Sequence, residues 1–366
     1  MAFVDLSVDY RLATSSRVAL HRLRDPMSCP VQQRASSQVP FTFLAFPKTG
    51  TLPMYQIRNP ASGPTSFLPK CLNPLSQPTE QPHCCAITMQ SANHLQKTLK
   101  SNTPAFGAWQ MLPGPTLPRT ICRASPSISW LLIDLEHGNL HDDNMHELVA
   151  AAASCGVSPV VRVADAQHWM IKRALDAGAH GILVPMIESV DDARRVVECA
   201  KFPPNGKRGF ESLLAVDKFR SHVYDPPTGG VSVHEPTGAE YLAQANDALV
   251  IGVQIETRGA LEDVEAIAAV NGIDVLFIGP FDLAVNIGFP ITGPGEENYA
   301  PELRDAIQRV YEAGRRYGKA VGIYCETGAQ ARSYARRGFG MVSVVTDLVG
   351  LGMLVKREFG VAAGVE

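Results

Sequence analysis

Two carboxylates follow apolar segments of the chain at the points where those segments end. Glu256 comes directly after LVIGVQI (249–255), and Asp282 lies just beyond IDVLFIGP (273–280). Such runs are typical of strands buried on both faces, and a charge at the end of a buried strand is unfavourable unless it coordinates or pairs with something. Because Mg²⁺ and Mn²⁺ prefer oxygen ligands, we predict that Glu256 and Asp282 hold a divalent cation. The alternative is that each acid only caps the helix that follows it.

Two further apolar segments end in residues that suit acid–base and oxyanion chemistry. The segment WLLIDLEH brings Asp134, Glu136 and His137, and the segment SPVVR ends with Arg162. Arg162 offers a fixed fork of donors to an enolate, or alternatively a structural ion pair to a nearby acid. Histidine titrates near neutral pH, so His137 suits proton transfer with a substrate hydroxyl, directly or through metal-bound water. Asp134 and Glu136 would orient or charge-stabilise its ring; a purely structural histidine is the alternative.

The sequence Gly279-Pro280-Phe281-Asp282 indicates a tight turn that opens a helix. Backbone N–H groups at such a start form an anion site, so we expect a substrate carboxylate to lie there beside the metal. The candidate residues include no cysteine, which argues against a thiolate zinc site, and no predicted strand ends in a lysine, which disfavours imine chemistry. The chain also lacks GxSxG and HExxH motifs. Of the reaction classes considered, metal-assisted enolate chemistry is the one that the sequence still supports.

Strand-like and helix-like patterns alternate from about residue 90 onward. The predicted strands are Phe106–Leu112, Trp130–Glu136, Pro159–Val163, Gly181–Ile187, Leu249–Ile255, Val275–Ile278, Lys319–Cys325 and Met341–Val345. The predicted helices are Asp142–Ser154, Gln167–Ala177, Val190–Ala200, Arg258–Ala269, Pro301–Tyr317, Ala329–Arg337 and Gly350–Phe359. Repeated strand-then-helix units with short connections predict an α/β fold, a closed (β/α)₈ TIM barrel, in which the carboxyl ends of the strands bring the candidate residues together. No GxGxxG follows the first strand, which weakens an open doubly wound sheet.

One long insertion, about residues 202–240, is rich in Gly and Pro. We place it after the fourth strand, on the side of the barrel that carries the active site. The sequence therefore predicts a lid or a subunit-contact loop.

The chain has two regions of different composition. Residues 1–88 are rich in Pro, Ser and Gln without hydrophobic periodicity, which predicts a disordered, low-complexity extension, and residues 89–366 form the predicted barrel domain. Arg11, Arg17, Arg22 and Arg24 are compatible with a mitochondrial transit peptide, although acidic residues dilute that signal. We expect a cytoplasmic protein, with the mitochondrion as the alternative.

The charge and cysteine content exclude several other classes. A formal net charge of −3 provides no basic field for nucleic acid or an anionic membrane, and no run of about 18 apolar residues predicts a membrane span. We interpret the eight cysteines as reduced thiols. We therefore expect small-molecule chemistry.

Several motifs occur in an order that resembles the HpcH/HpaI class II aldolases of the pyruvate-aldolase superfamily, from about residue 105 to about residue 358: IDLEHG, SPVVRV, LDAGAHGILVPMIES, FPPNGKRG, VQIETRGALED and FIGPFDLA. The resemblance implies a barrel whose last helix packs on a neighbouring subunit, in homo-oligomers built from dimers. It implies Mg²⁺, Mn²⁺ or Co²⁺ held by Glu256 and Asp282 and chelated by a 2-oxo acid. Arg162 would stabilise the pyruvate enolate, and His137 would be the general base.

The same resemblance implies three further roles. Asp176 of LDAG would pair with a histidine across a subunit interface, although its place near a helix end is also typical of a surface acid. Gln254 and the Phe281–Asp282 amides would hold the 2-oxo acid, and we add Trp109 of GAWQMLPG to this substrate-binding set.

The chain departs from the usual pattern of the family at two positions beside the expected site. Leu135 stands where a glycine is common, and Phe281 stands where alanine is common and could narrow the aldehyde pocket. IDLEHGNL and GAWQMLPG are similar to fungal members, including the macrophomate synthase type, which decarboxylates oxaloacetate and couples the enolate to another acceptor.

The sequence thus predicts a divalent-metal-dependent carbon–carbon lyase. It would cleave a 4-hydroxy-2-oxo acid, with a 2-keto-3-deoxy sugar acid as a candidate, to pyruvate and an aldehyde. The alternative is an oxaloacetate decarboxylase or an enolate-coupling enzyme of the macrophomate synthase type. A third possibility is a catalytically idle barrel that serves assembly or binding. Such a protein is expected to lack a metal-ligand or general-base residue, and this chain has a residue of the expected type at each of these positions.

Overall fold

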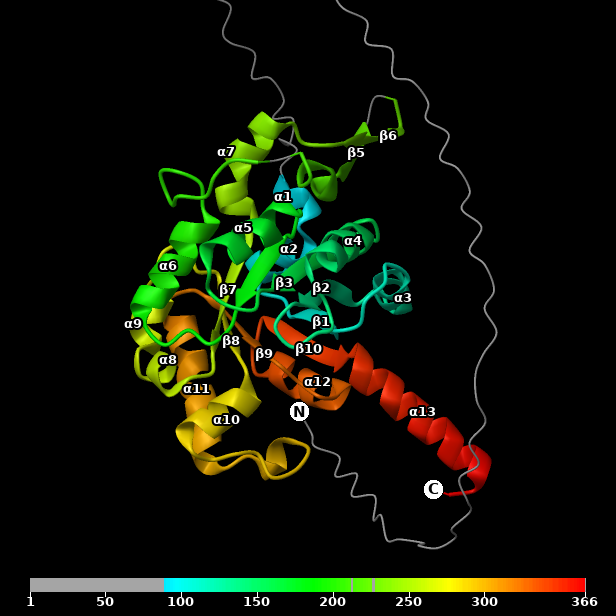
Figure 1. The fold of residues 1–366 in the computed structure, drawn as a ribbon, viewed down its shortest axis with the longest axis vertical. Coiled ribbons are helices and arrows are strands. Elements are labelled where there is room, and N and C mark those ends of the chain that lie inside the picture. Colours follow the sequence, from blue (N-terminus) through cyan, green and yellow to red (C-terminus); the bar gives the residue numbers. More distant parts are fainter. Residues whose placement is uncertain (1–88, 212, 226–227, 366) are drawn as a thin grey trace, which may run out of the picture. The chain divides into compact units, whose positions relative to one another are not determined.

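A computed structural model describes residues 89–211, 213–225 and 228–365 of the chain. Within these residues, eight parallel strands close into a barrel in the order β1-β10-β9-β8-β7-β4-β3-β2 (Figure 1). The barrel strands are β1 (Ala105–Gln110), β2 (Ile128–Asp134), β3 (Ser158–Arg162), β4 (Gly181–Val184), β7 (Val250–Ile255), β8 (Val275–Ile278), β9 (Ala320–Ile323) and β10 (Met341–Thr346). All eight predicted strands and the predicted (β/α)₈ barrel are confirmed. The predicted extension, residues 1–88, lies outside the described residues.

Helices follow the strands and, apart from the last one, surround the barrel (Figure 1). They are α3 (Thr116–Ala124), α4 (Asp142–Ala153), α5 (His168–Asp176), α6 (Val190–Ala200), α8 (Arg258–Glu262), α9 (Val264–Ala268), α10 (Pro280–Ile287), α11 (Pro301–Arg316), α12 (Gly328–Arg336) and α13 (Asp347–Ala363). The helix predicted at Arg258–Ala269 is divided at Asp263 into α8 and α9. In the part of the chain that is described, no helix is both long and apolar enough to cross a membrane.

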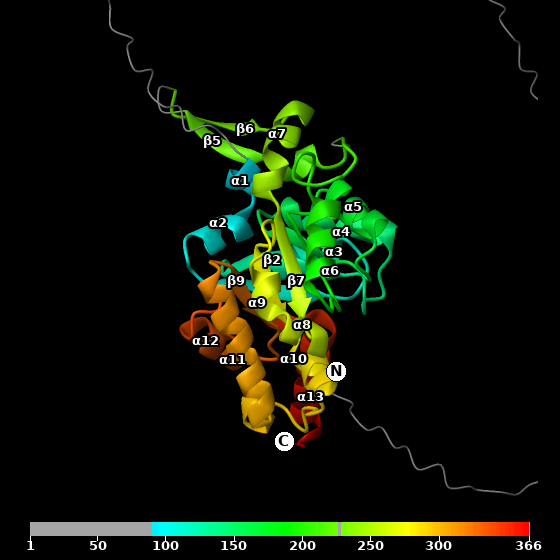
Figure 2. The same cartoon turned by 90° about the vertical axis from the view of Figure 1, so that its left-hand side faces the viewer.

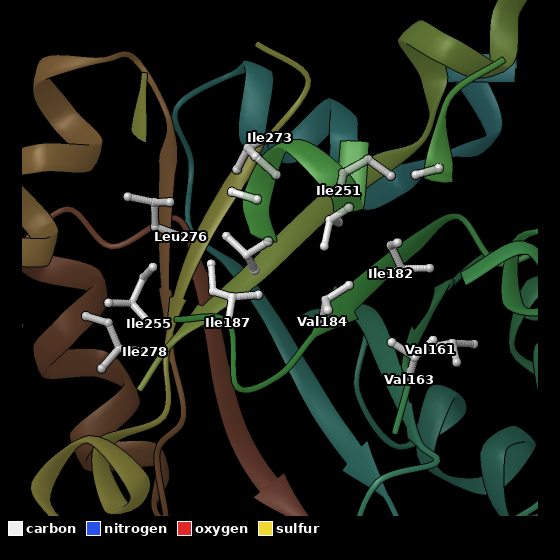
Figure 3. Close-up of a cluster of buried hydrophobic side chains, with 14 of the residues drawn as sticks. Val161, Val163, Ile182, Val184, Ile187, Ile251, Ile255, Ile273, Leu276 and Ile278 are labelled. Atoms are coloured by element: carbon white, nitrogen blue, oxygen red, sulfur yellow. The ribbon is translucent and has the colours of Figure 1, made fainter. Parts of the chain in front are cut away.

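The alternation of side chains along each strand produces two apolar layers. On β2, Trp130 and Leu132 point into the barrel, whereas Ile133 packs outward against the helices. Figure 3 shows the outer layer, where Val161, Ile182 and other residues of neighbouring strands form one buried cluster. Burial of each such side chain contributes about 1.5–3 kcal/mol, so this layer provides the rigid support for the strand ends.

Trp130 fills the barrel interior because the neighbouring strand has no side chain at Gly107. A Cβ atom at Gly107 would lie 2.1 Å from the Trp130 ring, so only glycine fits there. The Trp130 indole N–H donates to the carbonyl oxygen of Ala105 over 3.0 Å, which fixes the ring.

Two short helices that the sequence patterns did not indicate, α1 (Met89–Ala92) and α2 (His94–Lys100), lie at the amino-terminal ends of the strands (Figure 2). The Asn93 side-chain amide donates to the carbonyl oxygens of His180 and Ala248, each over 2.8 Å. Leu95 is fully buried in the inner apolar cluster. The helix α2 therefore closes this end of the barrel, and the opposite end remains as the mouth.

The expected position of the insertion is wrong. The insertion follows α6 rather than a strand, and contains the 3₁₀ turn η1 (Val216–Phe219), the hairpin β5 (Ser221–Asp225) and β6 (Gly230–His234), before α7 (Gly238–Ala248) leads into β7. The His180 imidazole, next to the start of β4, contacts the Lys218 carbonyl oxygen over 2.7 Å and stacks on Phe219. Figure 2 shows the hairpin beside α1, and α10 at the other end of the barrel. Because a helix precedes the insertion, the insertion lies at the amino-terminal ends of the strands and cannot serve as a lid within its own chain.

Candidate active site

The polar residues of the mouth continue the inward-facing positions of the strands. On β2 these positions are Trp130, Leu132 and Asp134, and on β3 the inward position that follows Val160 is Arg162. The inner apolar layers therefore end in charged groups on both strands. On β7 the same alternation brings Gln254 and then Glu256, of which Glu256 is only 1% exposed.

Arg162 is held from several directions. Its Nε and one terminal nitrogen donate to the two oxygens of Asp134 over 2.8 and 2.6 Å. Its other terminal nitrogen lies 2.9 Å from an oxygen of Glu136 and 3.4 Å from the Gln254 side-chain oxygen. The guanidinium also lies over the Trp109 ring, 4.9 Å from its centroid. The side chain of Arg162 therefore has one orientation, with its planar fork fixed inside the mouth.

Asp134 is fully buried, and it remains charged because of its neighbours. Burial alone would raise the pKa of this carboxyl, but the hydrogen bonds and the charge of Arg162 bring the pKa below its ordinary value. The Trp109 indole N–H donates to Asp134 over 3.0 Å. The pair Asp134–Arg162 is thus a permanent ion pair in which Trp109 supplies a further donor.

Glu256 is in the opposite situation. Its two oxygens accept hydrogen bonds from the Met186 backbone N–H over 2.8 Å and from the Gln254 amide over 2.6 Å. Burial, together with the negative charges of Asp282 and Glu136, raises the pKa of the Glu256 carboxyl to about 8. Within the protein alone, the negative charge of this group is insufficiently balanced.

The turn after β8 is shaped around the Glu256 carboxylate. A Cβ atom at Gly279 would lie 2.1 Å from an oxygen of Glu256, so only glycine allows the chain to pass this close. Pro280 then begins α10, and Asp282 lies in the first turn of that helix with an exposed side chain. The negative charge of Asp282 raises the pKa of both Glu256 and Glu136, so the three carboxylates are electrostatic neighbours.

This arrangement fits a divalent oxygen-liganded cation. A 2+ ion beside Glu256 and Asp282 would stabilise the ionised Glu256 carboxyl, whose pKa is raised by burial and by the nearby charge of Asp282. Across the described ranges, no three His, Cys, Asp or Glu side chains are arranged to ligate one ion by themselves. Two carboxylates are nonetheless sufficient for an ion such as Mg²⁺, which keeps waters and takes substrate oxygens as its other ligands.

His137 lies at the rim of the mouth. Its side chain is 45% exposed, and its Nε2 atom is 3.8 Å from an oxygen of Glu136. The Asp134 carboxylate accepts the backbone N–H of His137 over 3.3 Å, so Asp134 fixes the chain at this position rather than the ring. The ring is therefore near the ion pair and accessible to a substrate.

Asp176 is not brought to this site within the chain. It is the last residue of α5, at the amino-terminal ends of the strands, and it accepts a hydrogen bond from Arg208 over 2.8 Å. The Arg208 side chain is buried, and its guanidinium lies over the Phe202 ring. The predicted contact between Asp176 and a histidine therefore requires a second subunit.

The mouth also contains two residues that the sequence analysis did not identify, Tyr324 and Thr346. The Tyr324 hydroxyl lies 2.9 Å from the Thr346 hydroxyl. The Tyr324 ring meets the edge of Trp109 at a centroid distance of 5.3 Å and lies 6.2 Å from the ring of Phe281. The inward alternation of Ala320 and Gly322 along β9 reaches Tyr324 one residue beyond the strand, and this is the sequence signal that could have placed Tyr324 inside the mouth.

Comparisons with known proteins agree in pointing to one family. The model of the family described as HpcH/HpaI aldolase/citrate lyase matches residues 120–351. The hydroxypyruvate/pyruvate aldolase of Roseovarius nubinhibens is 32% identical over 72% of this chain and 95% of its own length. The 4-hydroxy-2-oxo-heptane-1,7-dioate aldolase of Salmonella dublin is 35% identical over 70% of this chain and 89% of its own. A crystal structure of an HpcH/HpaI aldolase/citrate lyase family protein from Burkholderia cenocepacia J2315 covers 74% of this chain and 99% of its own, with 31% identity and a TM-score of 0.63.

Proposed function

The chain belongs to the HpcH/HpaI aldolase/citrate lyase family, and from this premise we propose that it is a divalent-metal-dependent carbon–carbon lyase. It cleaves a 4-hydroxy-2-oxo acid to pyruvate and an aldehyde. The observation that carries the proposal is the position of Glu256. This buried carboxylate is an electrostatic neighbour of Asp282 and Glu136, and the Gln254 side chain connects it with the fixed fork of Arg162.

In this proposal Glu256 and Asp282 hold the ion. Bound there, a divalent cation supplies Lewis-acid polarisation of the 2-oxo group and charge neutralisation for the enolate. Mg²⁺, Mn²⁺ and Co²⁺ are the candidates. Gln254, whose side-chain oxygen and nitrogen already connect Arg162 with Glu256, would orient the 2-oxo acid, and the amides of Phe281 and Asp282 at the start of α10 would receive its carboxylate.

The roles of Arg162 and His137 follow from the contacts that hold Arg162 and from the exposure of His137. Arg162 is fixed by Asp134, so it presents its donors to the developing enolate charge without reorganisation, which is the property that makes oxyanion stabilisation effective. His137 is exposed at the rim and takes the proton of the C4 hydroxyl. The C3–C4 bond then breaks, the C4 hydroxyl becomes the aldehyde carbonyl, the bonding electrons form the pyruvate enolate, and a proton at C3 completes pyruvate.

We also propose that the enzyme is a homo-oligomer built from dimers. The helix α13 has seventeen residues, and none of them is buried. Leu351, Met353 and Phe359 are 56%, 60% and 73% exposed, and Figure 1 shows α13 extending away from the barrel. A second copy that covers this helix would remove its apolar side chains from water. Such an assembly would also supply the second subunit that the predicted role of Asp176 requires.

The experiment that tests the function is a screen for pyruvate release. Purified protein is treated with EDTA, supplied separately with Mg²⁺, Mn²⁺ or Co²⁺, and offered 4-hydroxy-2-oxo acids, including 2-keto-3-deoxy sugar acids, and oxaloacetate. The proposal expects metal-restored pyruvate release from at least one 4-hydroxy-2-oxo acid. Release from oxaloacetate alone would support the decarboxylase alternative, and EDTA-insensitive or absent release from all substrates would overturn the proposal.

A further inference from the structure

The loop that carries His137 is held at two places. This loop joins β2 to α4, and the Asp134 carboxylate accepts the backbone N–H groups of Glu136 and His137 over 3.1 and 3.3 Å. Beyond His137, the Asn139 N–H donates to the carbonyl oxygen of Met111 over 2.9 Å. The backbone at His137 therefore lies between an anchor on β2 and a second anchor just after β1.

The second anchor is a close contact with the backbone of Met111. A Cβ atom at Gly138 would lie 2.1 Å from the carbonyl oxygen of Asp134 and 3.3 Å from the Cα atom of Met111, so glycine allows the loop to pass close to both residues. The Met111 side chain packs on the inner apolar cluster, where it continues the inward alternation of Gly107 and Trp109 on β1. The place of Met111 therefore sets the place of the second half of the loop.

Met111 is held in turn by a carboxylate from the other end of the chain. The Met111 N–H donates to both oxygens of Asp347 over 3.1 and 3.0 Å, and the Leu112 N–H donates to one of them over 3.0 Å. Asp347 is the first residue of α13, and its carboxylate also accepts the Leu348 N–H of its own helix over 2.7 Å. Hydrogen bonds to a charged acceptor are shorter and stronger than bonds between neutral groups. Asp347 is thus a firm support for the segment that follows β1.

The contacts of Asp347 go beyond those of a helix cap. A carboxylate that only capped α13 would need partners in its own helix alone. Among the described residues, three of the four hydrogen bonds to Asp347 come instead from the backbone of Met111 and Leu112. A continuous series of hydrogen bonds therefore connects the start of α13 with the loop of His137.

We propose that Asp347 is a positioning residue for the general base. Its carboxylate fixes Met111, Met111 fixes Asn139, and the His137 ring is thereby kept where it takes the proton of the C4 hydroxyl. The inference rests on the proposed function, which supplies the role of His137. In that function the metal and the 2-oxo acid contact residues of β7 and α10, so loss of the Asp347 carboxylate should lower kcat and leave binding nearly unchanged.

The first test measures the loop itself and does not depend on activity. Asp347→Asn keeps the shape of the side chain but removes its charge and one of its two acceptor oxygens. Hydrogen exchange, followed by mass spectrometry on the full-length protein, should be about tenfold faster in the peptide that contains Asn139, because its bond to Met111 opens more often. Asp191→Asn, at an exposed aspartate in the first turn of α6, is the matched control and should leave this exchange unchanged. Unchanged exchange in Asp347→Asn would overturn the inference.

The second test is a double-mutant cycle for pyruvate release at saturating metal. His137→Ala should lower kcat about 100-fold, and Asp347→Asn about tenfold with a KM within about twofold of the wild type. The variant with both changes should be about 100-fold slower than the wild type, whereas independent effects would give about 1000-fold, because a displaced base has already lost part of its contribution. Asp191→Asn should behave as the wild type in this assay.

Light scattering on the same samples should find Asp347→Asn in the assembly of the wild type. Independent effects in the cycle, or a loss of turnover confined to dissociated protein, would contradict a role of Asp347 through His137. A wild type that releases no pyruvate from any 4-hydroxy-2-oxo acid would instead refute the proposed function. The exchange of the Asn139 peptide would in that case still show whether Asp347 fixes the loop.

Discussion

Arg162 and Asp134 occupy paired positions on β3 and β2 and form two parallel hydrogen bonds of 2.8 and 2.6 Å inside the barrel mouth. The backbone register of β2 with β3 by itself places the two side chains next to each other. The ion pair is almost completely desolvated, with Asp134 fully buried and Arg162 7% exposed. The orientation of the guanidinium is therefore set by the fold.

Arg162→Lys should lower kcat for pyruvate release about 100-fold. A lysine keeps the charge, but its single ammonium cannot maintain both bonds to Asp134 and still present a donor to the substrate. Steady-state kinetics with saturating metal, on protein shown by circular dichroism to be folded, provides the measurement. A kcat within about fivefold of the wild type would show that the planar fork has no role in the reaction.

Met186 should control metal binding through its backbone. It has a φ of 50°, which is unusual for a residue with a side chain, and its N–H donates to Glu256 over 2.8 Å. Glycine adopts this conformation readily, whereas a β-branched residue does so at a strain of about 1–3 kcal/mol. Met186→Gly should therefore bind Mn²⁺ nearly as tightly as the wild type in calorimetry, and Met186→Val about tenfold more weakly. Equal affinity of the two variants would contradict a positioning role of the Met186 backbone.

His180 should make the stability of the metal-free protein depend on pH in the acid range. Burial lowers the pKa of this imidazole from 6.5 to about 4. The unfolded chain therefore takes up a proton below pH 6.5 that the folded chain does not bind until about pH 4, so the stabilising contribution is complete above pH 6.5 and is lost as the pH falls to about 4. The loss corresponds to about 3 kcal/mol.

Urea unfolding in EDTA, compared between the wild type and His180→Gln, measures this effect. The difference in the free energy of unfolding between the two proteins should shrink by about 3 kcal/mol between pH 7 and pH 4. Other titrating groups are common to both proteins and cancel in the comparison. A difference that does not change with pH would contradict the buried neutral state of His180.

The exposed apolar surface of α13 should hold the subunits together. Phe359→Glu places a charge at a side chain that is 73% exposed in the single chain, where the change has little effect on folding. In the proposed oligomer the same charge would be buried without a partner, and dissociation should follow. Light scattering should therefore find a smaller species for Phe359→Glu but not for Phe359→Leu. An unchanged oligomer of Phe359→Glu would exclude this part of α13 from the interface.

The sequence alone predicted most of the barrel, because apolar runs such as 249–255 report directly on strands buried on both faces. It did not predict the end of the barrel on which the insertion lies, since that depends on whether a strand or a helix precedes the insertion. The Gly- and Pro-rich composition of the insertion does not show which end of the barrel it occupies. The correctly predicted helix Val190–Ala200, which directly precedes the insertion, places it at the amino-terminal ends of the strands.

The candidate site was predictable where a charge follows an apolar strand, as at Glu256 and Arg162, because burial makes such charges conspicuous. Tyr324 is itself compatible with an apolar strand end, so its hydroxyl gave no comparable signal. The contact between Tyr324 and Thr346 joins the residue after β9 to the end of β10 and could not be obtained from either segment alone. The proposed role of Asp176 depends on a second subunit, which lies beyond what one chain can provide.

The central claim is that Glu256 and Asp282 together hold the cation on which pyruvate release depends. The most direct measurement is metal-dependent pyruvate release by Glu256→Ala and Asp282→Ala. Glu265→Ala is the control, at a partly exposed acid on α9 that forms a surface ion pair with Arg316. We predict that both site variants lose metal-dependent turnover by about 10³-fold or more while remaining folded, and that the control behaves as the wild type. Turnover of either folded site variant within about tenfold of the wild type, with the same response to metal, would contradict the assignment.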